Sequence, residues 1–377
     1  MIEISTINIV RIAIISIMVL FYTAIPDSTL LNDKRNIQVS TLSSIVTISI
    51  GVLFIYLFGL RNYISTDSGD SFLYAYAYQH IETIVGPTFD DALKSREWAW
   101  ATLLLFLYQH HIDVSGFFTI VSVLYMVPIL YGCIKLGKSN SWILLLAFLL
   151  GITFMSNGMN GIRNGVACSI AFLGLLQITD HSKLKLSNFL SAVALCLIAH
   201  GIHGASVILI IPAFIVLFFI KSYKTALILW LSAIVLSLIF GNRIAFLVAD
   251  FDASERALSY LQGGESESNM AKFAHSGFRL DFLLYSAIPI VVGYYISIVK
   301  KIHDRRYNIL LFTYMLANAV WIIFIYAAYS NRFAMISWYL FPLTIIYPFI
   351  SISQLGDFRI RLSKISIVGL FIFFFVL

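Results

Sequence analysis

Charged residues are scarce in this chain of 377 residues: they make up 12% of it, against 60% for hydrophobic residues. The apolar residues come in runs long enough to cross a bilayer, which predicts an all-α, polytopic integral membrane protein. We expect a single transmembrane domain over residues 1–377. Its membrane-spanning helices, about 12 in number, are predicted near residues 6–25, 43–60, 114–134, 141–156, 162–179, 187–200, 203–220, 225–241, 280–299, 308–328, 335–352 and 364–377.

Cysteine is also rare, and the three present, Cys133, Cys168 and Cys196, all lie inside apolar runs. Scattered in this way they predict neither a disulfide framework nor a metal cluster. The sequence has no Walker, Rossmann or paired-carboxylate metal motif, so we expect no cofactor and no metal. No small-residue cleavage site follows the first apolar run, which we interpret as a retained anchor.

Basic residues recur in every second loop between the predicted spans. The positive-inside rule assigns such loops to the cytoplasm, and they carry Lys34 and Arg35, Lys135 and Lys138, Lys183 and Lys185, Lys221 and Lys224, Lys300 to Arg306, and Arg359 to Lys364. Topology therefore explains the net charge of +6, and no nucleic-acid partner is implied. The other loops are predicted to face outward, including two of medium length, 61–113 and 242–278.

The apolar stretch from Trp98 to Tyr108 lies inside the first of these outer loops. At roughly 11 residues it is too short to cross a membrane as a helix. Trp98, Trp100 and Tyr108 are side chains that favour the membrane interface. We therefore predict a re-entrant or interfacial helix on the outer face.

The first candidate site segment follows the second predicted span and contains Arg61, Asp67, Asp70 and Tyr74. Its carboxylates are able to bind sugar hydroxyls or a divalent cation, although two fall short of the roughly six oxygen ligands that hard cations take. The alternative, which we favour on spacing alone, is that Arg61 anchors the helix at the interface and an aspartate caps the next helix.

The second segment is an outer turn rich in glycine and asparagine, with Arg163 in the first turn of the span that follows it. A guanidinium beside the free N–H groups of a helix N-terminus suits a phosphate or diphosphate. The alternative is structural: Gly161 and Gly165 form a GxxxG packing face while Arg163 reaches the lipid headgroups. Both interpretations remain open.

The third segment carries His200 and His203 at another outer turn. A histidine there can accept a proton from an attacking hydroxyl, whereas a lone histidine pair is more often hydrogen-bonded at a helix end. Zinc is not expected, because no third ligand has a fitting spacing. Two further arginines, Arg279 and Arg332, are predicted on the same side, where arginines need an anionic partner other than headgroups. Pairing of Arg279 with Asp281 is the alternative.

Together these motifs resemble, in order and in spacing relative to the spans, the EpsG-like branch of the Wzy-type polysaccharide polymerases from about Gly59 to Pro342. They are GLR, a TDxGD-like loop with Tyr74, Arg96-Glu97, NGIRNGVACSIAFLG, IAHGIHGAS, GFRLDFLLY and NRFAMISWYLFPL. The family's arginine falls on Arg163 and its membrane-edge histidine on His203, which leaves His200 a supporting role.

The resemblance implies a bacterial inner-membrane glycosyltransferase of GT-C-like architecture that polymerises undecaprenyl-diphosphate-linked oligosaccharide units on the periplasmic face. It implies membrane lipids and a chain-length regulator as partners, and no metal. We expect the diphosphate to bind Arg163, Arg279 and Arg332, with a weaker candidate in Arg61. His203 is expected to act as the base, and sugar hydroxyls or arginines to be held by Asp67, Asp70, Tyr74 and Glu97.

Other functions stay open. An O-antigen ligase usually has one dominant outer loop, and a flippase places charge along a midplane pathway. An acyltransferase needs an acidic partner for its histidine, and none follows His200 or His203 in the sequence.

Overall fold

The computed structural model describes residues 1–31, 37–64, 69–179, 184–241, 243, 278–326 and 330–376. These residues form helices joined by turns, with one isolated β-bridge between Ile2 and Arg61. Eight helices in the described part are long and apolar enough to cross a membrane, and two shorter apolar helices accompany them. The polytopic, helical class is confirmed, while the predicted total of about 12 spans stays a prediction.

The chain divides into two compact units, which we describe separately. Unit 1 is Met1–Val207 with Ile346–Leu377, and unit 2 is Ile208–Ile345. The first part of unit 1 contains α1 (Ile4–Ala24), α2 (Asp27–Leu31), α3 (Ile37–Gly59), α4 (Asp70–Gln79), α5 (Ile81–Ile84), α6 (Phe89–Lys94), α7 (Trp98–Gln109) and α8 (Val114–Gly137). It continues with η2 (Lys138–Asn140), α9 (Ser141–Leu150), α10 (Thr153–Met155), the π-helical turn η3 (Ser156–Asn160), α11 (Ile162–Thr179), α12 (Leu186–Ile202) and η4 (Gly204–Ser206), and closes with η6 (Ser353–Leu355) and α22 (Phe358–Val376).

Helix α9 is the most deeply buried helix segment of unit 1, with every residue but Trp142 buried. Its sequence is apolar all round, as a helix enclosed by other helices requires. It stops at Gly151, and the chain continues through the short α10 into the π-helical turn η3. The predicted span 141–156 is therefore broken, and its second part leads directly to Arg163.

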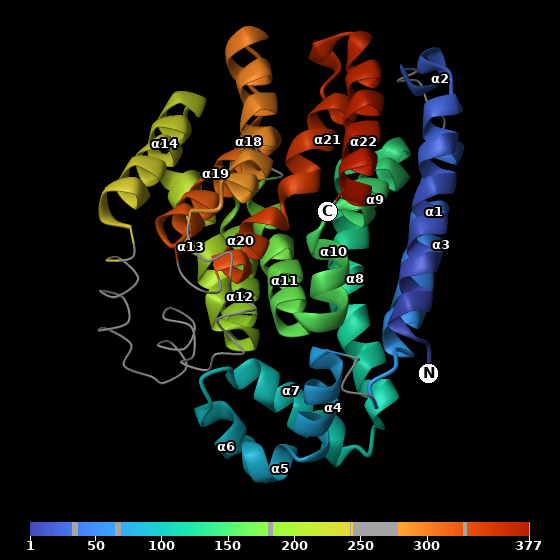
Figure 1. The fold of residues 1–377 in the computed structure, drawn as a ribbon, viewed down its shortest axis with the longest axis vertical. Helices are drawn as coiled ribbons and strands as arrows, with labels where there is room; N and C mark the ends of the chain where they lie inside the picture. The colour runs from blue at the N-terminus through green and yellow to red at the C-terminus, as the bar shows by residue number, and fades with distance from the viewer. Residues whose placement is uncertain are drawn as a thin grey trace. The chain divides into compact units, whose positions relative to one another are not determined.

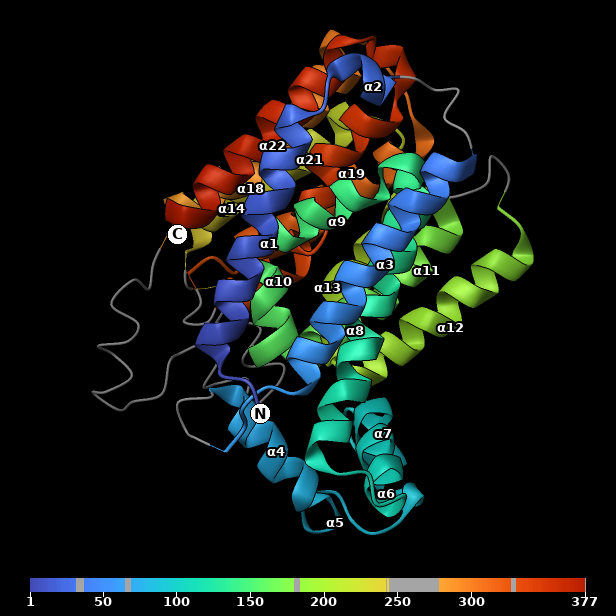
Figure 2. The same cartoon turned by 90° about the vertical axis from the view of Figure 1, so that its right-hand side faces the viewer.

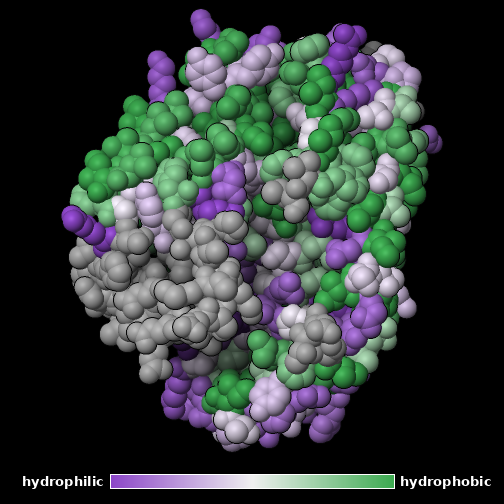
Figure 3. All heavy atoms as spheres, in the orientation of Figure 1, coloured by the Kyte–Doolittle hydropathy of each residue, from purple (hydrophilic) through white to green (hydrophobic). Residues whose placement is uncertain are grey.

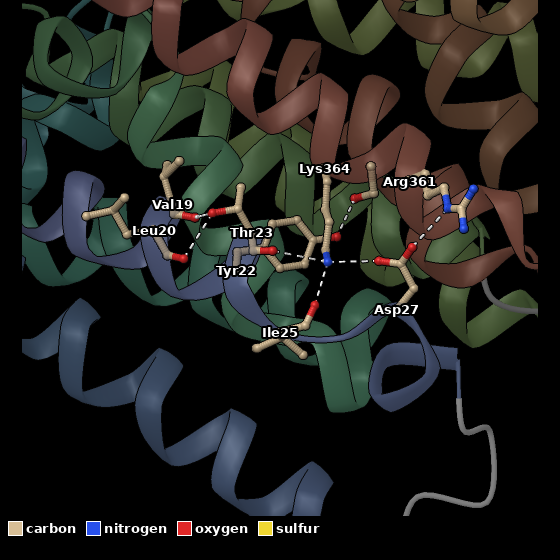
Figure 4. Close-up of polar contacts among 9 residues, drawn as sticks. Val19, Leu20, Tyr22, Thr23, Ile25, Asp27, Arg361 and Lys364 are labelled. Carbon is tan, nitrogen blue, oxygen red and sulfur yellow. Dashed lines mark hydrogen bonds and ion pairs between the residues drawn. The ribbon is translucent and has the colours of Figure 1, made fainter.

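One end of unit 1 collects the segments predicted to face the cytoplasm. Asp27, just after α1, forms ion pairs with Lys364 at 2.8 Å and Arg361 at 3.2 Å from α22, and Lys364 also donates to the backbone oxygen of Ile25 (Figure 4). The first turn of α9 reaches α3 at the same end, where Ser43 and Ser141 share a hydrogen bond of 2.8 Å. The sides assigned from the basic loops are consistent with this grouping.

The opposite end of unit 1 carries a cap of four helices, α4 to α7, which both ribbon views draw together beyond the end of α8 (Figures 1 and 2). We predicted a loop with one helix here, and the other three were missed. A capping box of Thr88 and Asp91 begins α6, and Asp113 caps α8 by accepting from the Gly116 N–H at 2.8 Å. Hydrophilic and apolar residues mix on the surface of this end (Figure 3), where Leu73 and Phe89 are exposed.

Unit 2 contains α13 (Val207–Phe218), α14 (Tyr223–Phe240), α18 (Leu280–Tyr294), η5 (Tyr295–Val299), α19 (Arg305–Ile323) and α20 (Ser330–Trp338), and α21 (Phe341–Ser351) continues into unit 1. Its helices are joined by a buried polar network around Asn318. This amide accepts from Trp230 at 2.9 Å and donates to Ser286 and Ser337 at 3.1 Å each. Most of the predicted loop 242–278 lies outside the described residues.

Candidate functional site

Glu97 joins two candidate residues that are distant in sequence. Its Oε1 lies 2.8 Å from Nδ1 of His203, and its Oε2 forms an ion pair with Nη1 of Arg163. The three side chains come from α7, α11 and α12, and all are partly exposed, at 20% for Glu97, 26% for Arg163 and 28% for His203. The structure thus brings together a carboxylate, a guanidinium and an imidazole that are all partly exposed.

Glu97 immediately precedes α7, and α12 brings His203 to it. His203 ends α12, where its N–H bonds to the carbonyl of Ala199 at 3.0 Å. Two residues earlier, Gly201 packs against the start of α7 so closely that a Cβ there would lie 2.5 Å from Cε2 of Trp98. Only glycine allows this approach, and the approach sets the distance between Glu97 and His203.

Arg163 lies in the first turn of α11, directly after η3. A Cβ on Gly165 would lie 2.4 Å from the backbone oxygen of Asn157 in that turn, while one on Gly161 would meet nothing nearer than 3.6 Å. The predicted GxxxG packing between helices is therefore wrong at Gly165, whose tight contact is with the turn before its own helix. This contact lets the turn fold back on α11 beside Arg163.

Arg61 is fully buried, at 0% exposure. Its guanidinium donates to the carbonyls of Phe58 and Met159 and to Ser122 Oγ, and it lies 4.5 Å from the ring centre of Phe118. Its donors point into the protein, and its bond to Met159 holds η3. Arg61 is therefore neither the predicted interface anchor nor the predicted diphosphate ligand.

Tyr74 lies on the other side of Arg163. Its hydroxyl is 3.5 Å from Nε of Arg163, and the guanidinium carbon lies 5.7 Å from the ring centre. Burial raises the pKa of Tyr74, with Arg163 opposing the shift, so the phenol stays neutral at physiological pH. Asp70 is one turn earlier on α4, on the same helix face as Tyr74, with Gly69 before it at a φ of 61°.

The charge state of Glu97 follows from its two partners. Burial alone would raise the pKa of Glu97, but the hydrogen bond with His203 and the charge of Arg163 outweigh it and lower that pKa. A charged carboxylate only accepts hydrogen bonds, so the proton between the two groups belongs to Nδ1 of His203. That tautomer leaves Nε2 of the neutral ring as an acceptor.

Four predicted residues remain to be placed: His200, Asp67, Arg279 and Arg332. His200 is exposed on the last turn of α12, and Asp67 lies outside the described residues. In unit 2, Arg279 forms a two-pronged ion pair with Asp281, at 2.9 and 2.6 Å, which was the alternative considered for it. Arg332 is exposed in the first turn of α20.

Among the described residues, no group of three or more His, Cys, Asp or Glu is arranged to hold a metal ion. The predicted absence of a metal stays a prediction. The argument against an acyltransferase, however, is wrong in its premise, because His203 does have an acidic partner. That partner is 106 residues away in sequence, and no local pattern indicates it.

The eight membrane-length helices of the described residues and the polar site at one end of unit 1 define a polytopic membrane protein with a candidate site for transfer chemistry. The EpsG family profile matches residues 44–377, most of the chain. The chain belongs to the EpsG family, and this membership supports a role of the membrane polysaccharide polymerase type. No curated protein and no solved structure matches it.

Proposed function

We propose that this protein polymerises undecaprenyl-diphosphate-linked oligosaccharide repeat units into a surface polysaccharide, without a metal, on the periplasmic face of a bacterial inner membrane. The observation that carries the proposal is the bridge of Glu97 between His203 and Arg163. The bridge places an oriented base beside a cation that can bind the leaving diphosphate. Glycosyl transfer from a diphosphate requires both groups.

In the proposed step, Nε2 of His203 accepts the proton of a hydroxyl on the non-reducing end of the incoming unit. The hydroxyl oxygen forms a bond to C1 of the reducing-end sugar of the growing chain. The bond from C1 to the diphosphate oxygen breaks, and the lipid diphosphate leaves with the electron pair. Glu97 holds the Nδ1–H throughout and stabilises the imidazolium that forms.

Arg163 binds the leaving diphosphate in this scheme, since a guanidinium matches phosphate oxygens in charge and geometry. Arg279 and Arg332 are retained as further diphosphate ligands, on sequence grounds. Asp70 and Tyr74 are assigned to sugar hydroxyls or to holding Arg163. A GT-C-like architecture and a chain-length regulator as partner belong to the same proposal.

The periplasmic orientation has support from unit 1. Its basic segments around Lys364 and Arg361 lie at the end where α1 finishes and α3 and α9 begin, whereas Glu97 lies in the cap beyond the other end. Basic loops mark the cytoplasmic side, so the site is assigned to the outer side.

The test compares two histidines three residues apart. We expect His203→Gln to lower polymer formation by roughly 10² to 10⁴ fold, the usual contribution of a general base, and His200→Gln to keep most of it. Glu97→Gln should resemble His203→Gln. Glycans are resolved by length in the protein's own host, with membrane levels of each variant matched. Long polymer made by His203→Gln at the normal rate would overturn the assignment.

Deletion of the gene separates the other functions. A polymerase mutant carries single repeat units on the acceptor. A ligase mutant keeps long polymer on the carrier lipid, and a flippase mutant shows no outward-facing unit. Either of the last two results would replace this proposal.

A further inference from the structure

Arg11 is a buried cation in the middle of α1, one of the membrane-length helices, with 6% exposure. An arginine inside a membrane span is costly, and it usually has a partner and a function. It lies within the first apolar run of the sequence, which we interpreted as a retained anchor. The structure shows that it faces into unit 1 and not the lipid.

Its partners are the backbone carbonyls at the end of α9. Nε and Nη2 both donate to the oxygen of Leu149, Nε at 2.9 Å, and Nη2 also donates to Gly151 at 3.2 Å. Helix ends leave carbonyls without intrahelical partners and carry partial negative charge, both of which favour a cation there. The rings of Phe374 and Phe154 lie 4.6 and 5.7 Å from the guanidinium carbon.

The segment that starts at this break is the one that leads to Arg163. It runs from Gly151 through α10 and η3, and its far end is held by a second buried arginine, Arg61, at the carbonyl of Met159. Each end of the segment is thus fixed by a guanidinium bonded to backbone oxygens. Near the N-terminus, the N–H of Ile2 also donates to the carbonyl of Leu60, the residue before Arg61, at 2.6 Å.

We infer that Arg11 is a positioning residue for the site: by holding the end of α9 it sets where η3, and therefore Arg163, lies. The family match begins at residue 44, so this support comes from a helix outside the matched residues. The test of this inference by enzyme activity rests on the proposed function, whereas the test by cysteine labelling does not.

The structural test uses Met159→Cys as a reporter, because Met159 lies in η3 and is 2% exposed. A membrane-impermeant maleimide labels it slowly while the turn is held, and the three native cysteines, all buried, give the background in the unsubstituted protein. We expect Arg11→Met to speed labelling by roughly tenfold or more, since the turn loses one of its two anchors.

Arg359→Met is the matched control, because Arg359 is also buried in unit 1 and donates to a helix-end carbonyl, that of Ile350, at 2.9 Å. It should leave the labelling rate within about twofold, because the contact that it loses lies outside the segment from Gly151 to η3 and separate sites act almost independently. Unchanged labelling in Arg11→Met would overturn the inference. So would equal acceleration in Arg359→Met, which would indicate general loosening.

In membranes supplied with the native lipid-linked unit, Arg11→Met should lower kcat by roughly tenfold or more with KM within about threefold, because displacement of Arg163 weakens the transition state more than binding. Arg11→Lys should lie between, since an ammonium keeps the charge without the planar fork. An unchanged kcat would overturn the inference. Faster labelling together with normal polymer in His203→Gln would sink the proposed function and leave the positioning role standing.

Discussion

Gly201 offers a direct test of the site's geometry. A Cβ there would lie 2.5 Å from Cε2 and 2.7 Å from Nε1 of Trp98, and 2.9 Å from Cβ of Ala99. Since carbon atoms pack at about 3.5 Å or more, we expect Gly201→Ala to move α12 away from α7 by up to about 1 Å, because the Cβ of Ala99 cannot rotate away as the indole can. The same movement stretches the 2.8 Å contact between His203 and Glu97 to about 3.8 Å, beyond hydrogen-bond range.

A displacement of this size costs roughly 10² fold in rate, or about 2.7 kcal/mol, while the stability cost of such overpacking is about 1–3 kcal/mol. The rate is measured as polymer formed in isolated membranes from the native lipid-linked unit, per molecule of inserted protein. Gly204→Ala is the control, because a Cβ at Gly204 would meet only His200, at 4.0 Å. Full activity of Gly201→Ala, or an equal loss in Gly204→Ala, would refute the geometry.

Three further predictions concern other parts of unit 1. Gly165→Ala should abolish most polymer formation, because its Cβ would lie 2.4 Å from a backbone oxygen. Gly161→Ala should be tolerated, because the nearest atom to its Cβ is 3.6 Å away. Both variants are compared by the length of the glycans that they produce. Because the pKa of Glu97 is lowered, the stabilisation from its ion pairs should be complete above its ordinary value of 4.5 and disappear as pH falls below that value. Thermal unfolding of the wild type and Glu97→Gln should therefore converge in acid, and a constant difference down to the lowest pH would contradict this. Asp27→Asn should cost at most about 1 kcal/mol, as for other partly exposed ion pairs, and leave polymer output unchanged; a large loss of output would show that this end of the unit takes part in the reaction.

The parts of the fold that hydropathy and loop charge control could be predicted. The helical class, the apolar segments and the placing of the basic loops on one side follow from local sequence. The three additional cap helices were missed because polar, aromatic segments such as Asp70–Gln79 have no membrane-length run. The break at Gly151 was missed because the cation that binds the carbonyl of Leu149 comes from Arg11, 138 residues away in sequence.

The candidate site shows the same limit. Arg163 and His203 were chosen because they are ionisable residues at span ends, and that signal is local. Glu97 was expected only to support arginines or sugars, since nothing in the sequence indicates that one carboxylate contacts both residues. The role of Gly201 depends on the indole of Trp98 across a helix contact, so a lone glycine between two histidines has no distinguishing pattern. Arg11, by contrast, had a readable signal: a single arginine within an apolar run.

The shared carboxylate also gives the site a charge balance suited to the proposed step. A histidine that acts as a base must start neutral, so with Glu97 and Arg163 charged the three groups sum to zero before the proposed reaction. Proton transfer to His203 makes the sum +1 at the moment when the diphosphate gains one negative charge. The new positive charge of the site then attracts the negative charge of the leaving group. A carboxylate paired only with Arg163 would neutralise that cation and leave the imidazolium unsupported. Because Glu97 directs one oxygen to each residue, it stabilises the new imidazolium and at the same time holds the Arg163 guanidinium in place for the diphosphate.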